Sequence, residues 1–139
     1  MTSTIKTELD KLLKEFADDL ASPHTFNTFA RPRLNRWYYS PVIEVYLTTG
    51  WYLAPEGTSE WVINISNIKT IEKYQRQGAF KYFLKCIEQL AKTYKGRVRV
   101  ENVHSLRLRP YLIQRGYVAA KHDAITFWEY RDYGQQKKV

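Results

Sequence analysis

Apolar side chains recur every three or four residues in two segments of the chain, which is the spacing of an amphipathic helix. In residues 4–21 the apolar positions are Ile5, Leu9, Leu12, Leu13, Phe16 and Leu20. In the second segment they are Phe80, Phe83, Leu84, Ile87, Leu90, Ala91 and Tyr94. Gly96 follows the second segment at the place where a left-handed C-cap residue would end a helix. The pattern therefore predicts one helix at the N-terminus and another in the middle of the chain.

Strands are expected where β-branched and aromatic residues dominate or alternate with polar ones. These segments are residues 37–39, 42–48, 51–53, 60–68, 97–102, 117–120 and 124–130. Thr49 and Gly50 are expected to form a turn, and so are residues 55–59. Residues 24–36 show no clear period, which indicates irregular structure or a short helix. A further short helix is expected within residues 105–115, with Pro110 in its first turn.

This order of elements predicts an α+β or mixed α/β domain, in which helices are embedded in a mostly antiparallel sheet. The chain has 139 residues, of which 44 % are apolar and 15 % aromatic, so we expect one domain, residues 1–139, with a full core. The high aromatic content excludes a disordered chain.

The sequence also bears on location. No apolar stretch approaches the roughly 20 residues that span a bilayer, so an integral membrane protein is not expected. The first residues lack the apolar core of a signal peptide, and Cys86 is the single cysteine. We therefore expect a cytoplasmic protein without an internal disulfide. The three histidines, His24, His104 and His122, are too scattered for metal-ligand spacing, so no metal site is expected.

Charge is unevenly distributed along the chain, whose net charge is +8. Residues 1–60 carry six basic and eight acidic side chains, a net −2, whereas residues 61–139 carry sixteen and six, a net +10. Such a basic half attracts anions, which include nucleic acid, anionic membranes and phosphorylated small molecules. Net charge alone does not choose among them.

The segment before the central helix is the most informative for function. Gly78 lies between an expected strand and the helix, where a glycine lets the backbone approach a ligand. The unpaired N–H groups of a helix start form an anion site, for which phosphate is the natural occupant. Lys73, Arg76 and Lys81 flank this turn and would neutralise phosphate charge. The Walker pattern and the three-glycine dinucleotide fingerprint are both absent. An ordinary turn at a helix start is the alternative.

With this turn, the chain resembles the GNAT superfamily of acyl-CoA-dependent N-acetyltransferases. The family signature is Arg/Gln-x-x-Gly-x-Gly/Ala after a long strand, matched here from Gln75 to Gly78, with Phe80 in the last position. A second family block, a strand and then a helix that ends in Gly-Phe or Gly-Tyr, is similar to residues 98–117. The resemblance covers about residues 37–130.

The resemblance implies that acetyl-CoA lies between two splayed strands, here residues 60–68 and 97–102. Its pyrophosphate would sit on backbone N–H groups of the glycine turn, and its pantetheine arm would pair with the edge of the first strand. The residues implied in cofactor binding are Ile68, Lys69, Thr70, Gln75, Arg76, Gln77, Gly78, Ala79, Phe80, Lys81 and Asn102.

The resemblance further implies direct transfer of acetyl from the thioester to an amine, assisted by a base and by an acid that protonates the thiolate. Tyr111, on the short helix, is the expected acid, with Tyr117 or water as alternatives. For the base, the candidates are Glu44, a charge within an apolar strand, and Glu101, on the strand expected to line the groove. A salt bridge with neighbouring arginines is the alternative role of Glu101.

A rival hypothesis is a catalytically inactive GNAT-like module that binds nucleic acid or a protein through its basic half. Five arginines fall within nineteen residues of that half: Arg97, Arg99, Arg107, Arg109 and Arg115. This clustering, interleaved with Tyr111, is typical of nucleic-acid surfaces. On the enzyme hypothesis the same charges would favour an anionic acceptor or partner. The identity of the amine acceptor and the oligomeric state do not follow from the sequence.

Overall fold

The computed structural model describes residues 1–22, 31–105, 107–121 and 123–130. In this part of the chain three α-helices accompany one six-stranded sheet, which confirms the α+β class. The elements are α1 (Ser3–Ala21), β1 (Leu34–Tyr39), β2 (Ile43–Leu53), β3 (Ser59–Thr70), the short 3₁₀ helix η1 (Glu72–Tyr74), α2 (Ala79–Thr93), β4 (Arg97–Val100), α3 (Leu108–Gln114), β5 (Tyr117–Ala120) and β6 (Asp123–Glu129).

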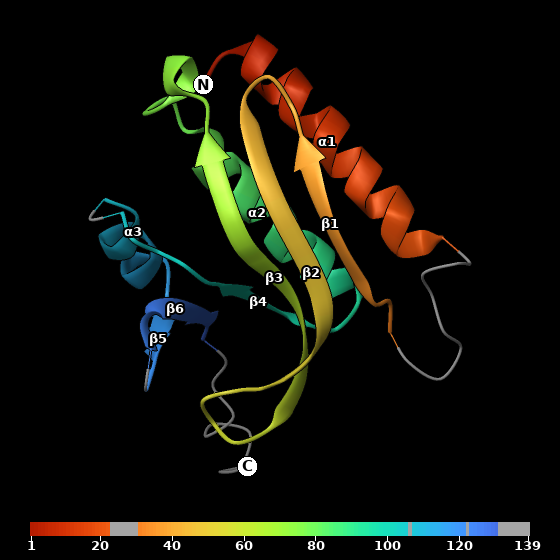
Figure 1. Ribbon diagram of the computed structural model, residues 1–139, viewed down its shortest axis with the longest axis vertical. Helices are drawn as coiled ribbons and strands as arrows, with labels where there is room; N and C mark the ends of the chain where they lie inside the picture. The colour runs from red at the N-terminus through yellow and green to blue at the C-terminus, as the bar shows by residue number, and fades with distance from the viewer. Residues whose placement is uncertain (23–30, 106, 122, 131–139) are drawn as a thin grey trace.

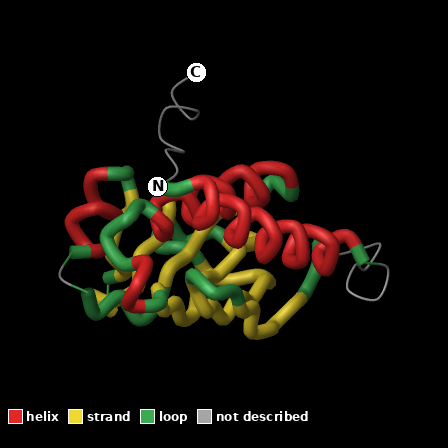
Figure 2. Tube along the Cα trace, turned by 90° about the horizontal axis from the view of Figure 1, so that it is seen from above, coloured by secondary structure: helices red, strands yellow, loops and turns green. Residues whose placement is uncertain are grey.

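The sheet has the strand order β1-β2-β3-β4-β6-β5 and is mostly antiparallel, as expected (Figure 1). Only the central pair, β3 and β4, is parallel, and α2 makes the crossover between these two strands. The long helices α1 and α2 lie side by side on one face of the sheet (Figure 2). Their apolar stripes, predicted from the spacing, form the core with the facing side chains of β2, β3 and β4.

The end of α2 differs in detail from the prediction. Lys95, not Gly96, takes the left-handed conformation, with φ of 56°. The Gly96 N–H donates to Ala91 O (2.7 Å) and the Lys95 N–H donates to Lys92 O (3.0 Å), the two bonds of a Schellman cap. Gly96 is required for space instead, because a Cβ there would lie 2.4 Å from the indole of Trp61.

The predicted turn at Thr49 and Gly50 is wrong, because β2 runs through it as one continuous strand. Gly50 pairs with Val62 of β3, and its φ is not positive. The chain turns after β2, where Gly57 has φ of 90° and its N–H donates to Ala54 O (2.9 Å). Glycine is common in turns, but Gly50 is flanked by strand-forming residues and pairs within the sheet.

Several other expectations are confirmed, including the helix start with Pro110 in the first turn of α3 and the closing hairpin of β5 and β6. Leu34 to Arg36 are in β1, so the strand begins earlier than expected. Residues 24–30, part of the segment expected to be irregular or helical, lie outside the described residues. Within the described ranges, no helix is long and apolar enough to cross a membrane.

The feature that shapes the molecule is the separation of β3 from β4. The two strands pair over four residue pairs, from Val62 with Arg97 to Ile65 with Val100. Beyond Ile65, β3 continues to Thr70 while β4 turns away (Figure 1). At the same point Ser66 is an extra residue in β3, because Tyr46 of β2 faces Asn67 and Leu47 faces Ile65. This β-bulge bends the strand where the separation begins.

Candidate functional site

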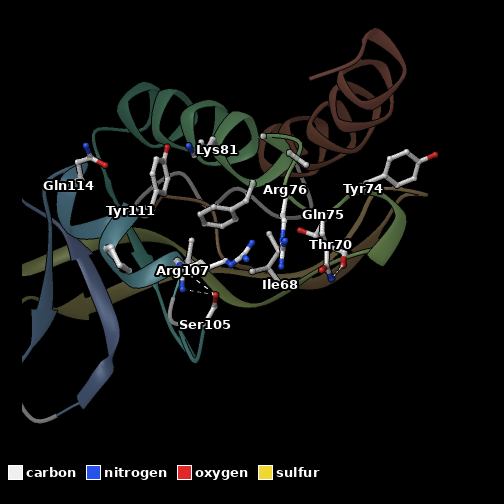
Figure 3. Close-up of a pocket in the computed structure, with 15 residues that line it drawn as sticks. Ile68, Thr70, Tyr74, Gln75, Arg76, Lys81, Ser105, Arg107, Tyr111 and Gln114 are labelled. Atoms are coloured by element: carbon white, nitrogen blue, oxygen red, sulfur yellow. Dashed lines mark hydrogen bonds between the residues drawn. The ribbon is translucent and has the colours of Figure 1, made fainter.

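A cleft of about 760 Å³ lies where β3 and β4 separate. One wall is the end of β3 with the glycine turn and the start of α2, and the other wall is α3 with the residues before it (Figure 3). The cleft is thus built from the segments that the sequence singled out, which are far apart along the chain.

The glycine turn is shaped for close approach of a ligand to the backbone. Gly78 is the N-cap of α2 with φ of 84°, and Arg76 also has a positive φ, of 65°. The first bond of the helical ladder runs from the Tyr82 N–H to Gly78 O (3.0 Å). The N–H groups of Ala79, Phe80 and Lys81 therefore have no acceptor within the helix. They face an anion site reinforced by the positive end of the helix dipole.

Basic side chains line the cleft, and among the residues that the structure describes no acidic side chain does. Arg76 and Lys81 come from the turn and α2, and Arg107 comes from the N-cap of α3. Figure 3 shows the Arg76 and Arg107 side chains extending toward one another from opposite walls. Among the described residues, none of these three cations is in an ion pair with a carboxylate. Charge and backbone donors together select for an anionic ligand.

The edge of β3 gives the cleft a second kind of binding group. The Ile71 N–H donates to Val42 O (2.8 Å), toward β2. Because alternate residues of a strand direct their backbone groups to opposite edges, Thr70 and Ile68 direct theirs away from β2, into the cleft. The Gln75 side-chain amide donates to Thr70 O (3.2 Å). The backbone of Ile68 is thus placed to pair with an amide-containing ligand.

Tyr111 stands at the end of the cleft opposite the β3 edge. The Lys81 Nζ lies 5.1 Å from its ring centroid, and the Phe80 ring meets it edge-on at 6.4 Å. Burial raises the pKa of the Tyr111 phenol above its ordinary value of 10, and the nearby Arg115 guanidinium opposes this shift. A phenol held protonated at neutral pH can donate a proton.

Glu101 lies just after β4 and is held in a polar network at the point of separation. Its Oε1 accepts from Asn64 Nδ2 (2.5 Å) and from Ser66 Oγ (2.8 Å), while Oε2 lies 3.3 Å from the Arg99 guanidinium. The carboxylate is fixed by these contacts, but 29 % of the side chain remains exposed. The salt bridge expected for Glu101 is present, and the Glu101 side chain is not among those that line the cleft.

Most residues implied in cofactor binding line the cleft: Ile68, Thr70, Gln75, Arg76, Gly78, Ala79, Phe80 and Lys81. Three others do not. Lys69 is exposed and pairs in register with Glu44, so it lies on the opposite face of the sheet. The Gln77 side chain donates back to Lys73 O (3.1 Å). Asn102 Nδ2 donates to Ser66 O (2.8 Å), which ties the chain after β4 to the bulge.

Glu44 is not brought to the cleft. It is half-buried on β2, between Tyr39 and Lys69 in the register of the sheet. Alternation along β2 places it on the face opposite the helices, because its neighbours Ile43 and Val45 are in the core. A charge in an apolar strand therefore has a simple explanation here, since the strand is covered on one face only.

Some residues of the cleft were not expected in the cofactor site, and they come mainly from α3 and from the segments before α2 and α3. They are Tyr74, Ser105, Arg107, Leu108, Pro110 and Gln114. With Tyr111, the last four follow helical spacing on one face of α3. That periodicity was a usable signal, although seven residues are too few for it to stand out.

The clustered arginines do not form one basic surface. Arg97 is fully buried, with Nη1 2.5 Å from Glu56 Oε2, and Arg99 contacts Glu101. The Arg115 guanidinium is paired with Glu88, and Nε lies 3.0 Å from Oε2. Three of the five charges are thus neutralised inside the fold. Arg109 Nε donates to Val103 O (3.0 Å), and Arg107 faces the cleft.

The remaining reactive side chains lie away from the cleft. Cys86 is half-buried on α2, where burial raises the pKa of its thiol above 9. His104 is exposed and does not line the cleft, while His24 and His122 lie outside the described residues. No group of three or more His, Cys, Asp or Glu suited to a metal is found in the described part of the chain.

No family model and no curated protein matches the sequence. Twelve chains of solved structures match the fold. Among them is a chain from the crystal structure of the KacTA–DNA complex, with a TM-score of 0.52 and 10 % sequence identity. The similarity covers 85 % of this chain and 78 % of that one. At this identity, the similarity shows a shared fold alone.

Proposed function

We propose that this protein is an acyltransferase of the GNAT type, which moves an acetyl group from acetyl-CoA to an amine. The observation that carries the proposal is the cleft, where a helix start, cations that form no ion pair with a described carboxylate, and an open strand edge meet. Coenzyme A presents the complementary groups in one molecule, namely phosphates and an amide-rich arm. An inorganic anion alone would not use the strand edge.

The residues of the cleft fit this ligand in order. The pyrophosphate would bind the N–H groups of Ala79 to Lys81, with Arg76 and Arg107 neutralising its charge. The pantetheine amides would pair with the backbone of Ile68, as an added strand does. The thioester would then point toward Tyr111 at the far end of the cleft.

The transfer needs one proton removed and one supplied. The neutral amine attacks the carbonyl carbon of the thioester, the C–S bond breaks, and the thiolate leaves. Tyr111 would give its proton to the departing sulfur, and Glu101 would accept the proton of the amine through a water molecule. The Glu101 carboxylate is held by its hydrogen bonds to Asn64 and Ser66, which fix its orientation.

The test is to measure binding and turnover separately. Calorimetry with CoA should show one site per chain, and thermal unfolding should shift upward with CoA and with acetyl-CoA, since a ligand of the native state stabilises it. Release of free thiol from acetyl-CoA is then followed with a polyamine, an aminoglycoside, and peptides with a free N-terminus or lysine. Binding without turnover on any amine would favour the inactive module, and absence of CoA binding would reject the proposal.

A further inference from the structure

Phe80 contributes to both ends of the cleft. Its backbone N–H belongs to the anion site at the start of α2, while its ring reaches Tyr111 at the other end. The ring centroids are 6.4 Å apart and the planes are nearly perpendicular, at 80°. A single residue therefore lies between the place of the phosphates and the place of the thioester.

We propose that the Phe80 ring is a gate that controls entry of the pantetheine arm and so determines which part of coenzyme A the free protein admits. This inference rests on the proposed function. The nucleotide half would bind at the helix start without moving the ring. The arm, which must run from the helix start along Ile68 to Tyr111, would enter only when the ring turns away.

The surroundings of Phe80 allow such a movement. The ring is only half-buried, at the border of the core, and its aromatic partner is Tyr111, which is half-buried as well. A side chain at this depth changes rotamer more readily than one inside a close-packed core. By contrast, the next apolar position of the helix, Phe83, is fully buried and cannot respond to a ligand in this way.

The charges of the cleft make the two halves of the ligand separable. Arg76 and the free N–H groups lie at the turn and the helix start, so they recognise phosphate whatever the position of the ring, whereas the Lys81 ammonium lies over Tyr111. Binding of the arm, however, must overcome the contact of Phe80 with Tyr111. In the native chain the arm therefore adds little affinity beyond that of the nucleotide.

The experiment compares two ligands by calorimetry: coenzyme A and 3′-phosphoadenosine 5′-diphosphate, its nucleotide half. In Phe80→Ala, the affinity for coenzyme A should rise at least tenfold, while that for the nucleotide should stay within twofold. Phe80→Leu, which keeps apolar bulk without the ring, should give an intermediate rise and covers the case that the alanine variant folds poorly. Ile113→Ala, an exposed position of α3 outside the cleft, is the matched control and should change neither affinity.

The outcomes separate the gate from the function on which it rests. If the nucleotide binds and the alanine variant shows unchanged or weaker affinity for coenzyme A, Phe80 is a wall of the site and the gate is rejected. If neither ligand binds to any variant, the proposed function itself fails. A rise for both ligands equally would also overturn the gate, because the ring would then obstruct the anion site.

Discussion

Gly78 meets two requirements at one position. Its φ of 84° is a conformation that β-branched residues rarely adopt, and inside the protein its missing side chain leaves space, with Met1 Cβ as the nearest atom at 3.9 Å. The Gly78→Val variant should therefore bind coenzyme A at least tenfold more weakly, since valine disfavours the positive φ that orients the N–H groups of the anion site. Calorimetry measures this loss.

Gly57→Val is the control for the backbone strain that Gly78→Val introduces. Gly57, in the turn after β2, has φ of 90° and open space around it, and it does not line the cleft. Gly57→Val should lose stability to a similar extent, about 1–3 kcal/mol from the backbone conformation, with unchanged affinity for coenzyme A. Equal affinities in the two valine variants would show that the turn does not contact the ligand.

Tyr111 should matter for turnover and little for binding. Since a general acid contributes about 10²–10⁴-fold, Tyr111→Phe should lower kcat at least tenfold and leave coenzyme A affinity nearly unchanged. Because burial raises its pKa, the phenol is protonated below pH 10, and the rate should decline only as pH rises above that value. Tyr82→Phe, which removes a phenol bound to Asp10 outside the cleft, should keep normal kcat. A normal rate in Tyr111→Phe would leave the ring a packing role alone.

At the scale of elements, the position of α3 depends on one ionic cluster. Glu88 of α2 is buried and accepts from Arg115, at the end of α3, and from the Tyr117 hydroxyl (2.7 Å), at the start of β5. Burial and the Glu88 charge raise the pKa of Tyr117 well above 10, so the hydroxyl remains a donor. The cluster joins the helix that carries Tyr111 to the helix that forms the anion site.

We expect the charges of Glu88 and Arg115 in this cluster to be strongly coupled. Glu88→Leu or Arg115→Leu alone should each destabilise the fold by about 2 kcal/mol or more, because the partner is left unpaired and partly buried. The double variant should lose less than the sum, with a coupling of about 1–3 kcal/mol in a denaturation cycle. The exposed pair Lys14 and Asp18 of α1 is the control and should give about 0.3–0.5 kcal/mol. If the losses of unfolding free energy in the two single variants simply add in the double variant, the two side chains are not coupled and the cluster does not position α3.

Elements with a long, regular period were predicted well, and those defined by their partners were not. The stripes of α1 and α2 fixed both helices to within one residue at the start, because a helix closes its own hydrogen bonds. The path of β2 through Gly50 depended on pairing with β3, which no local pattern contains. Glu88 was missed for the same reason, since its partners come from α3 and β5.

The same distinction holds for the candidate site. The glycine turn is a local motif, and its residues line the cleft almost without exception. Lys69 was misplaced because the face of a residue after the bulge cannot be counted from the strand before it. Asn102 follows β4, and its side chain donates back to the Ser66 carbonyl, a contact that exists only in the fold. Arg97 and Arg99 looked like free charges in the sequence, yet Glu56 and Glu101 meet them only in the fold.

For the whole molecule, these internal ion pairs change what a net charge of +8 means. Of the five clustered arginines, Arg107 and Arg109 are without a carboxylate partner among the described ion pairs, and only these two are offered to an outside anion. If duplex DNA binds this cluster, log K against log salt should have a slope of about −1.8, compared with about −4.5 for all five. Fluorescence titrations at several salt concentrations measure the slope.

Repeating the DNA titration with bound acetyl-CoA tests whether the two ligands share Arg107. Arg107 lines the cleft, so bound acetyl-CoA should weaken any DNA binding at this cluster, and the Arg107→Ala variant should weaken both. A slope near −4.5 that acetyl-CoA does not alter would contradict this view of the charges and support the nucleic-acid module.

The bulge at Ser66 determines which residues of β3 face the helices. Before it, the odd-numbered residues Ile63 and Ile65 face the helices, and after it the even-numbered Ile68 and Thr70 do so. If Ser66 instead paired regularly with Tyr46, the rest of β3 would shift by one residue, which turns every later side chain and backbone group to the other side. The cleft would then be walled by Asn67 and Lys69. Such a protein would retain the glycine turn and Tyr111, yet the backbone groups of Ile68 would point toward β2 and no longer into the cleft.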